Sequence, residues 1–283
     1  MRRAIADIYR GEPVLEGAGV RLHRVFGSFE VPNFDPFLLL DDFRSDNPAD
    51  YLRGFPWHPH RGIETITYVL QGKVRHGDSM GNSGVIGAGD VQWMTAGSGI
   101  IHEEMPQRVA EPLLGFQLWV NLPASRKMAD PRYHGLLAAQ IPVARPATGT
   151  HVNVICGTVD GVSGPVSAIY AAPSYVDVKL ESGSRIELPV AQGHTVFAYV
   201  IDGEVSLGPK PAKTVDRESL VVFAKTGDCV AAIAGPQGTR FLLASGKPLE
   251  EPIAWGGPIV MNTQQELELA FEEYEQGTFI KHA

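Results

Sequence analysis

The pattern of apolar and polar positions predicts a chain built mainly of short β-strands. In residues 64–70, Ile66, Tyr68 and Leu70 fall on one face of a strand, and the run is rich in β-branched residues. The apolar block 36–40 begins with a proline and is followed by aspartates, as is typical of a buried strand. Three further strands are expected at 20–26, 90–94 and 115–122. The pattern therefore indicates an all-β protein.

A helical pattern is found only near the end of the chain. Asn262 or Thr263 can cap the N-terminus of this helix, and Leu267 and Ala270 supply apolar positions. Gly277 suits the position just after its last turn. The glutamates of this segment are expected to form the solvated face of the helix.

The two halves of the chain share a repeated pattern. Residues 68–74 match residues 199–205, and residues 89–97 match residues 227–235, in the same order and at nearly the same offset. Two barrels of the same type are the simplest explanation.

The predicted domain boundaries lie on either side of the stretch between these halves. Residues 126–150 are rich in proline and charged side chains, which predicts a linker. This gives an N-terminal domain at 1–125 and a C-terminal domain at 151–283 that ends in the helix.

Composition and charge narrow the class of protein. The formal net charge of -8 argues against direct binding of nucleic acid, because there is no surplus of cations to neutralise phosphates. The two cysteines, Cys156 and Cys229, lie far apart in a chain without a secretory signal, so reduced thiols are expected. No apolar run reaches transmembrane length. We expect a soluble, cytoplasmic monomer without a membrane partner.

Two pairs of metal-capable side chains stand out in residues 55–106. His58 and His60 form one i, i+2 pair, and His102 and Glu104 form the other. Alternate residues of a strand point to the same face, so all four converge if the two strands pair. Three imidazoles and a carboxylate suit iron, zinc, manganese, copper or nickel, whereas calcium prefers oxygen ligands.

The second half lacks such a set. Carried across the offsets of the repeat, the four positions fall on Pro189, Ala191, Arg240 and Leu242. We therefore expect a second domain without metal, with a structural or partner-binding role.

Other polar residues of the first half are expected to have structural roles. His76 is expected at the rim or in solvent, and Asp41 and Asp42 are expected to cap a turn rather than act as acid and base. Arg61 is expected to hydrogen-bond a carboxylate, for which Glu64 is a candidate.

Longer motifs resemble those of the pirins, which are members of the cupin superfamily. The matching motifs are Gly54–Thr65, Gln92–Pro106, Leu118–Leu122, Glu251–Ala254 and Gly257–Thr263. A lone His-x-His is a weak signal, but this combination spans nearly the whole chain.

The resemblance implies a bicupin, with two antiparallel β-barrels face to face and one metal in the N-terminal barrel. The ligands implied are His58, His60, His102 and Glu104. Glu64 stands where many cupins place their carboxylate ligand, a role that passes to the position of Glu104 in pirins. Iron is the metal usual in the family, and manganese, nickel, copper, cobalt and zinc remain open.

The resemblance also implies an activity, because some pirins are similar to quercetin 2,3-dioxygenase. The protein would then be an oxidoreductase that cleaves flavonols such as quercetin with O2. Four ligands leave two positions of an octahedral metal open, and Glu104 would take the proton of the flavonol 3-hydroxyl. Four apolar side chains near the ligands could line the substrate cavity or simply belong to the core of the barrel. They are Phe55, Trp57, Ile66 and Trp93.

Two alternatives remain open. In the first alternative, the protein is a pirin-like regulator that binds partner proteins, and the metal is a structural or redox-sensing element. In the other alternative the metal is purely structural.

Overall fold

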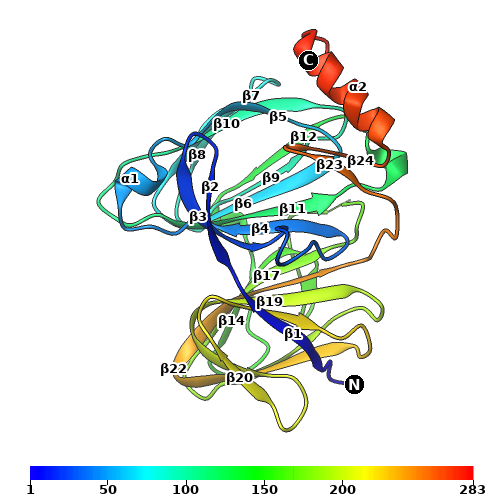
Figure 1. Ribbon diagram of the computed structural model, residues 1–283. Helices are drawn as coiled ribbons and strands as arrows, with labels where there is room; N and C mark the ends of the chain where they lie inside the picture. Colours follow the sequence, from blue (N-terminus) through cyan, green and yellow to red (C-terminus); the bar gives the residue numbers. More distant parts are fainter. Residues whose placement is uncertain (168, 283) are drawn as a thin grey trace. The chain divides into compact units, whose positions relative to one another are not determined.

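The protein folds into two compact units in this computed structural model, which describes residues 1–167 and 169–282. Glu12–Ala138 and Leu249–Ala283 form the site unit, and Met1–Gly11 and Ala139–Pro248 form the second unit. Antiparallel β-strands make up most of both units (Figure 1). The predicted all-β class with two barrels and a short C-terminal helix is confirmed. No helix in the described ranges is long and apolar enough to cross a membrane.

The site unit is built of two main sheets. The larger has the strand order β12-β9-β6-β11-β4-β3-β2, and the smaller has the order β5-β10-β7-β8. The strands of the larger sheet are β2 (Glu12–Glu16), β3 (Val20–Phe26), β4 (Phe37–Asp42), β6 (Ile63–Gln71), β9 (Val91–Thr95), β11 (Leu114–Asn121) and β12 (Arg132–Leu136). Those of the smaller sheet are β5 (Phe55–His60), β7 (Val74–Asp78), β8 (Ser83–Ile86) and β10 (Ile100–Pro106). The unit also contains the hairpin of β23 (Ala254–Gly256) and β24 (Ile259–Met261), and the helices α1 (Pro48–Tyr51) and α2 (Gln264–Glu275).

Strand β6 lies in the middle of the larger sheet, between β9 and β11. Both of its faces are buried: Ile66 and Tyr68 are 1% exposed on one face, and Thr65 and Thr67 are 2% exposed on the other. The predicted alternation is therefore present. It places Thr67 on the face that meets β10 of the smaller sheet.

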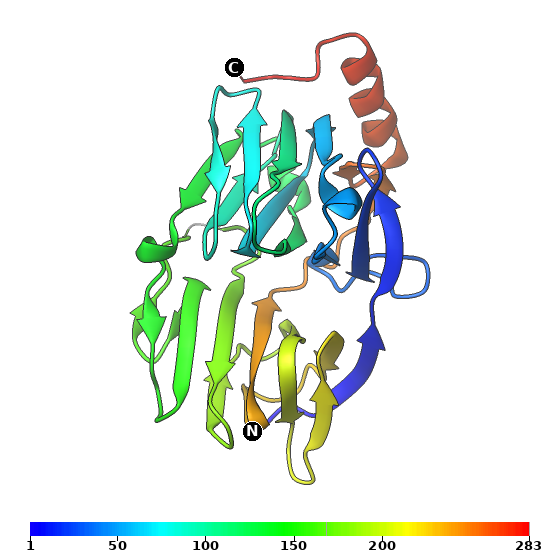
Figure 2. The same ribbon diagram turned by 90° about the vertical axis from the view of Figure 1, so that its left-hand side faces the viewer.

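The second unit is one sheet curled around an aliphatic core (Figure 2). Its order is β1-β21-β19-β22-β17-β14-β13, with β18 paired to β22 and β20 paired to β19. The strands are β1 (Ile5–Arg10), β13 (Val143–Ala144), β14 (Thr150–Cys156), β17 (Ser174–Leu180), β18 (Arg185–Pro189), β19 (Thr195–Leu207), β20 (Lys213–Asp216), β21 (Ser219–Phe223) and β22 (Cys229–Gly246), beside the small pair β15 (Thr158–Val159) and β16 (Val162–Ser163). The long strands β19 and β22 pair along much of their length in the middle of this sheet, and they also carry β20 and β18.

The predicted repeat is visible in a glycine that both units share. Gly72 and Gly203 occupy matching positions and have φ values of 83° and 72°. A Cβ atom at Gly203 would lie 2.2 Å from the carbonyl oxygen of Gly238. Both backbones therefore take the left-handed conformation that glycine tolerates, between β6 and β7 in the site unit and at an irregularity of β19 in the second unit.

Each unit contains one terminal segment of the chain in addition to one continuous central segment. The predicted boundaries at 125 and 150 divide the chain only once and so place both terminal segments differently. Strand β1 pairs with β21 in the second unit, and residues 249–283 belong to the site unit. Within the predicted linker 126–150, β12 pairs with β9 and forms the edge of the larger sheet. The sequence does not predict this short strand, because Gly135 lies within it, Pro131 directly precedes it, and both residue types are typical of loops.

Helix α2 begins at one of the two predicted caps. The Thr263 side chain accepts the N–H of Glu266 at 3.2 Å, and the Glu266 carboxylate accepts the N–H of Thr263 at 2.9 Å. This capping box satisfies two N–H groups that the helix leaves free. Leu267 and Ala270 are buried, and Gly277 follows the helix with a φ of 71°.

Candidate metal centre

The pairing of β5 with β10 brings three histidines together. His102 lies opposite His58, and Ile100 lies opposite His60. Ring nitrogens of the three histidines lie within 4.8 Å of one another. Within the described ranges, this is the one group of three or more His, Cys, Asp or Glu side chains with donor atoms close enough to hold a metal ion.

Hydrogen bonds fix where the protons of two of these rings lie. His58 Nδ1 donates to the carbonyl oxygen of Pro56 at 2.8 Å, and His60 Nδ1 donates to that of Pro258 at 3.0 Å. In a neutral imidazole the other nitrogen then carries a bare lone pair. The Nε2 atoms of His58 and His60 lie 3.1 Å apart, so two lone pairs face each other.

The ring of His102 cannot donate a hydrogen bond to both of these lone pairs. His102 Nε2 lies 3.0 Å from His58 Nε2 and can donate one proton at most. A single cation among the three Nε2 atoms would satisfy all of them. The donor set therefore fits a transition metal.

Burial keeps two of the imidazoles in the neutral form that binds metals. Burial and the nearby His58 lower the pKa of His60 to about 3, against the hydrogen bond to Pro258. Burial and then the neighbouring histidines lower the pKa of His102 well below its ordinary value. Protons therefore compete weakly for these two nitrogens at neutral pH.

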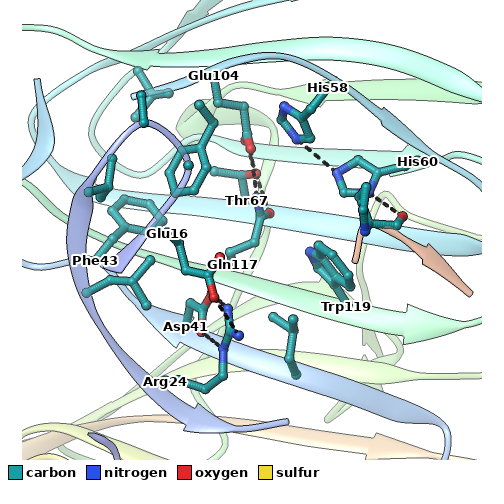
Figure 3. Close-up of a pocket in the computed structure, with 18 of the residues that line it drawn as sticks. Glu16, Arg24, Asp41, Phe43, His58, His60, Thr67, Glu104, Gln117 and Trp119 are labelled. Carbon is teal, nitrogen blue, oxygen red and sulfur yellow. Dashed lines mark hydrogen bonds and ion pairs between the residues drawn. The ribbon is translucent and has the colours of Figure 1, made fainter. Parts of the chain in front are cut away.

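The carboxylate of Glu104 lies outside the histidine group. A β-bulge follows His102 in the pairing of β10 with β5, so Glu104 does not keep the register of His102. Its Oε1 accepts the hydroxyl of Thr67 at 2.7 Å, and its Oε2 accepts the amide of Gln117 at 2.7 Å (Figure 3). Metal ligation by Glu104 stays a prediction.

Glu104, Thr67 and Gln117 form a closed ring of three contacts. The third contact joins Thr67 Oγ1 to the side-chain oxygen of Gln117 at 2.8 Å. Thr67 and Gln117 each bring one hydrogen to the ring, whichever way the amide is turned. The single hydroxyl hydrogen of Thr67 is shared between Glu104 Oε1 and the side-chain oxygen of Gln117. The two donors therefore hold the carboxylate of Glu104 in place.

His58, His60 and Glu104 line a cavity of about 660 Å³. This volume lies in the range of small-molecule sites. Most of its walls are apolar and include Leu22, Leu39, Phe43, Val74, Leu113 and Trp119. Phe55 and Trp57 also line it, whereas Ile66 and Trp93 belong to the buried core.

His76 is buried, which corrects the expectation of a rim or solvent position. It is 1% exposed, and its ring stacks on Tyr133 at a centroid distance of 5.1 Å. Its ring also lies 5.8 Å from that of His102. Tyr133 belongs to β12, so the covering of His76 follows from a strand that the sequence conceals.

Arg61 has a different carboxylate partner from the expected one. It pairs with Glu273 of α2 at 2.7 Å and donates to the carbonyl oxygen of Phe279 at 2.8 Å. Glu64 instead accepts the hydroxyl of Thr95 at 2.8 Å. The C-terminal segment therefore supplies two partners of Arg61 from a distant part of the chain, beside the carbonyl oxygen of Ser98.

The two adjacent aspartates have separate roles. Asp41 accepts two hydrogen bonds from Arg24, each at 2.8 Å, so the turn-cap prediction is wrong for Asp41. Asp42 accepts the backbone N–H of Arg44 at 3.1 Å, as expected of a residue that caps a turn.

Sequence reasoning missed three residues that shape the site. Thr67 and Gln117 oppose each other in the pairing of β6 with β11, which makes them a polar pair in the interior. The strand register would have revealed this pair, but neither residue is distinctive alone. The carbonyl of Pro258 reaches His60 from 198 positions along the chain.

The repeat positions of the second unit carry other side chains. Arg240 donates two hydrogen bonds to Asp177, at 2.9 and 2.7 Å, and Leu242 is fully buried. Neither arrangement offers a free donor to a metal. That the second unit works without metal stays a prediction.

Comparisons with known proteins identify the family. The family model for pirin matches residues 19–120, and that for the pirin C-terminal cupin domain matches residues 175–280. Human pirin is 41% identical over 264 residues, which cover 92% of this chain and 88% of human pirin. A pirin-like protein of Caulobacter vibrioides is 44% identical over 278 residues, covering 98% of this chain and 99% of that protein.

A solved structure supports the same assignment. The crystal structure of quercetin 2,3-dioxygenase from Acinetobacter baumannii matches with a TM-score of 0.87 at 34% identity, covering 99% of this chain and 98% of that one. The chain thus belongs to the pirin family.

Proposed function

We propose that the protein is a metal-dependent dioxygenase that cleaves flavonols such as quercetin. The observation that carries this proposal is the histidine group with bare, facing Nε2 atoms at the wall of a small-molecule cavity. The similarity to a protein titled quercetin 2,3-dioxygenase supports the choice of substrate.

His58, His60, His102 and Glu104 are the residues that would hold the metal. When bound, the metal supplies Lewis-acid and redox chemistry that amino acids lack. Imidazole and carboxylate ligands suit iron, which we propose as the native metal. Manganese, nickel, copper, cobalt and zinc accept the same donors, and their supply in the cell decides among them.

Glu104 would act as the base toward the substrate. Its carboxylate lies at the cavity wall, where Oε1 can take the proton of the flavonol 3-hydroxyl. Thr67 and Gln117 would hold the carboxylate in place for this transfer. General-base catalysis of this kind contributes roughly 100- to 10,000-fold to a rate.

The apolar walls would orient the flat substrate and exclude water. Phe43 and Leu39 line the cavity together with Trp119, whose ring lies 4.9 Å from that of His60. A flavonol seated against these side chains would present its hydroxyl to Glu104. Cleavage would consume one O2 and release one carbon monoxide.

A metal screen tests the proposal. The protein is loaded with each of the six metals in turn and incubated with quercetin under oxygen, and the absorbance of the flavonol is followed. We expect its loss with at least one metal and no loss with the His102→Ala variant. Unchanged absorbance with all six metals would contradict the proposal for quercetin.

A regulatory role is the second candidate. All residues that line the cavity belong to the site unit, so the second unit is available for contacts with partner proteins. The relatives of the whole chain include human pirin. In a regulatory role, the metal would serve as a structural or redox-sensing element. A partner captured from lysate only in one oxidation state of the metal would favour this role.

A further inference from the structure

The cavity has a second polar end, formed by Glu16, Arg24 and Asp41. All three side chains line the same cavity as the histidines. Figure 3 shows this group on a different side of the cavity from His58 and His60. A ligand that is held at the histidines and spans the cavity would therefore meet a charged group.

One guanidinium joins two carboxylates at this end. Arg24 Nε and Nη2 donate to the two oxygens of Asp41, each at 2.8 Å, and Arg24 Nη1 lies 2.8 Å from Glu16 Oε1. With both carboxylates ionised, one positive and two negative groups leave a net charge of −1. Burial raises the pKa of the Asp41 carboxyl, and the hydrogen bonds and charge of Arg24 oppose that rise. We call these three residues the acidic end.

Glu16 is the member of the acidic end that a ligand can reach. Its side chain is 38% exposed, compared with 17% for Arg24 and 8% for Asp41. Both carboxylates accept hydrogen bonds and, when ionised, donate none. The accessible surface of the acidic end therefore favours hydrogen-bond donors and repels anions.

We propose that the acidic end selects ligands whose remote ring carries neutral hydroxyl groups, and that Glu16 rejects ligands with an anionic group on that ring. The selection rests on the proposed function at the other end, where the enol hydroxyl of the ligand is held. Apolar side chains between the two ends, among them Leu22, Leu39 and Phe43, fit the flat body of such a ligand. The substrate class is therefore a flat enol with a hydroxylated, uncharged remote ring.

Binding of 3-hydroxyflavones tests this selection without turnover. The metal-loaded protein is titrated by calorimetry in the absence of oxygen with three probes, whose phenyl rings carry 3′,4′-dihydroxy, 3′,4′-dimethoxy or 4′-sulfonate groups. For the wild-type protein we expect the dihydroxy probe to bind about tenfold more tightly than the dimethoxy probe, and the sulfonate to bind most weakly.

Two variants of Glu16 and one control separate charge from shape. Glu16→Gln and Glu16→Ala should each reduce the penalty on the sulfonate about tenfold, because the acidic end becomes neutral. Glu187→Gln removes a carboxylate that pairs with Arg2 in the second unit, and it should leave the ratios unchanged. Thermal denaturation confirms that each variant is folded.

The outcomes distinguish this inference from the proposed function. Equal affinities of the three probes, unchanged ratios in both Glu16 variants, or no binding of any probe would overturn the selection by the acidic end. If the affinities for the three probes show the expected ratios but quercetin is not cleaved under oxygen, the selection by the acidic end is supported. Only the proposed dioxygenase activity is then contradicted.

Discussion

His60 Nδ1 donates to the carbonyl oxygen of Pro258 at 3.0 Å, across 198 positions of the chain. A hydrogen bond on one ring nitrogen fixes the tautomer and direction of the other, which is the metal-binding atom. Pro258 lies in the turn between β23 and β24, next to Gly257, whose φ is 53°. The C-terminal hairpin is therefore part of the candidate metal centre.

Substitution of Gly257 tests this dependence. Gly257→Val strains the turn and should displace the carbonyl of Pro258, which we expect to weaken metal binding about tenfold. Gly183→Val is the matched control, because Gly183 has a φ of 69° and equally open surroundings in the second unit. Both variants should lose about 1–2 kcal/mol of stability from the left-handed backbone. Competitive metal titration would contradict the dependence if both variants kept the wild-type affinity.

The facing lone pairs of His58 and His60 predict that metal binding stabilises the fold. At a free metal concentration of a thousand times Kd, the free energy of unfolding should rise by about 4 kcal/mol. His102→Ala should lose most of this gain, whereas His23→Ala, at an exposed position of β3, should keep it. Thermal denaturation with metal and with chelator measures both. An undiminished gain in His102→Ala would show that the histidine group is not the site.

Thr67 is predicted to position Glu104 for proton transfer. Thr67→Val removes the hydroxyl that bonds Glu104, and we expect kcat on quercetin to fall about 10- to 100-fold, part of the range for a general base. Thr95→Val is the control, because it removes a similar hydroxyl from Glu64 in the same unit. Both variants should lose about 1–3 kcal/mol of stability. Equal rates for the two variants would remove Thr67 from the mechanism.

Glu64 should make stability depend on pH. Burial raises the pKa of its carboxyl from 4.5 to about 7, against the hydrogen bond of Thr95 and the charge of Arg132. Between these values the folded chain binds more protons than the unfolded chain, so the stability contributed below pH 4.5 is lost as pH rises to 7. The side chain of Gln in the Glu64→Gln variant does not titrate. The unfolding free energy of the variant, relative to that of the wild-type protein, should therefore rise by about 3 kcal/mol between pH 4 and pH 8.

Chemical denaturation of both metal-free proteins at pH 4, 6 and 8 measures this difference. The two proteins differ only at residue 64, so the comparison isolates the contribution of that side chain. A difference in unfolding free energy that stays constant with pH would refute the assignment to Glu64.

Local pattern predicted several strands of the site unit, and it predicted that the histidines converge if two of those strands pair. Side chains at His58 and His60 share a face because strand periodicity is two, and antiparallel pairing with His102 completes the group. The helix cap at Thr263 is equally local, because it depends on a residue three positions away. The family resemblance added the bicupin architecture.

Long-range contacts account for what the sequence did not reveal. The burial of His76 depends on Tyr133 of the concealed strand β12, and the partner of Arg61 comes from α2. The position of the Glu104 carboxylate depends on a β-bulge, which shifts it away from the register of His102. Such features follow from how distant segments pair, which periodicity does not encode.

The stoichiometry of quercetin oxidation tests the central claim most directly. The metal-loaded protein is given quercetin and oxygen, and O2 uptake and carbon monoxide release are measured together. We expect one carbon monoxide released for each O2 consumed, and neither uptake nor release with His102→Ala. Oxygen uptake without carbon monoxide, or equal release by His102→Ala, would contradict it.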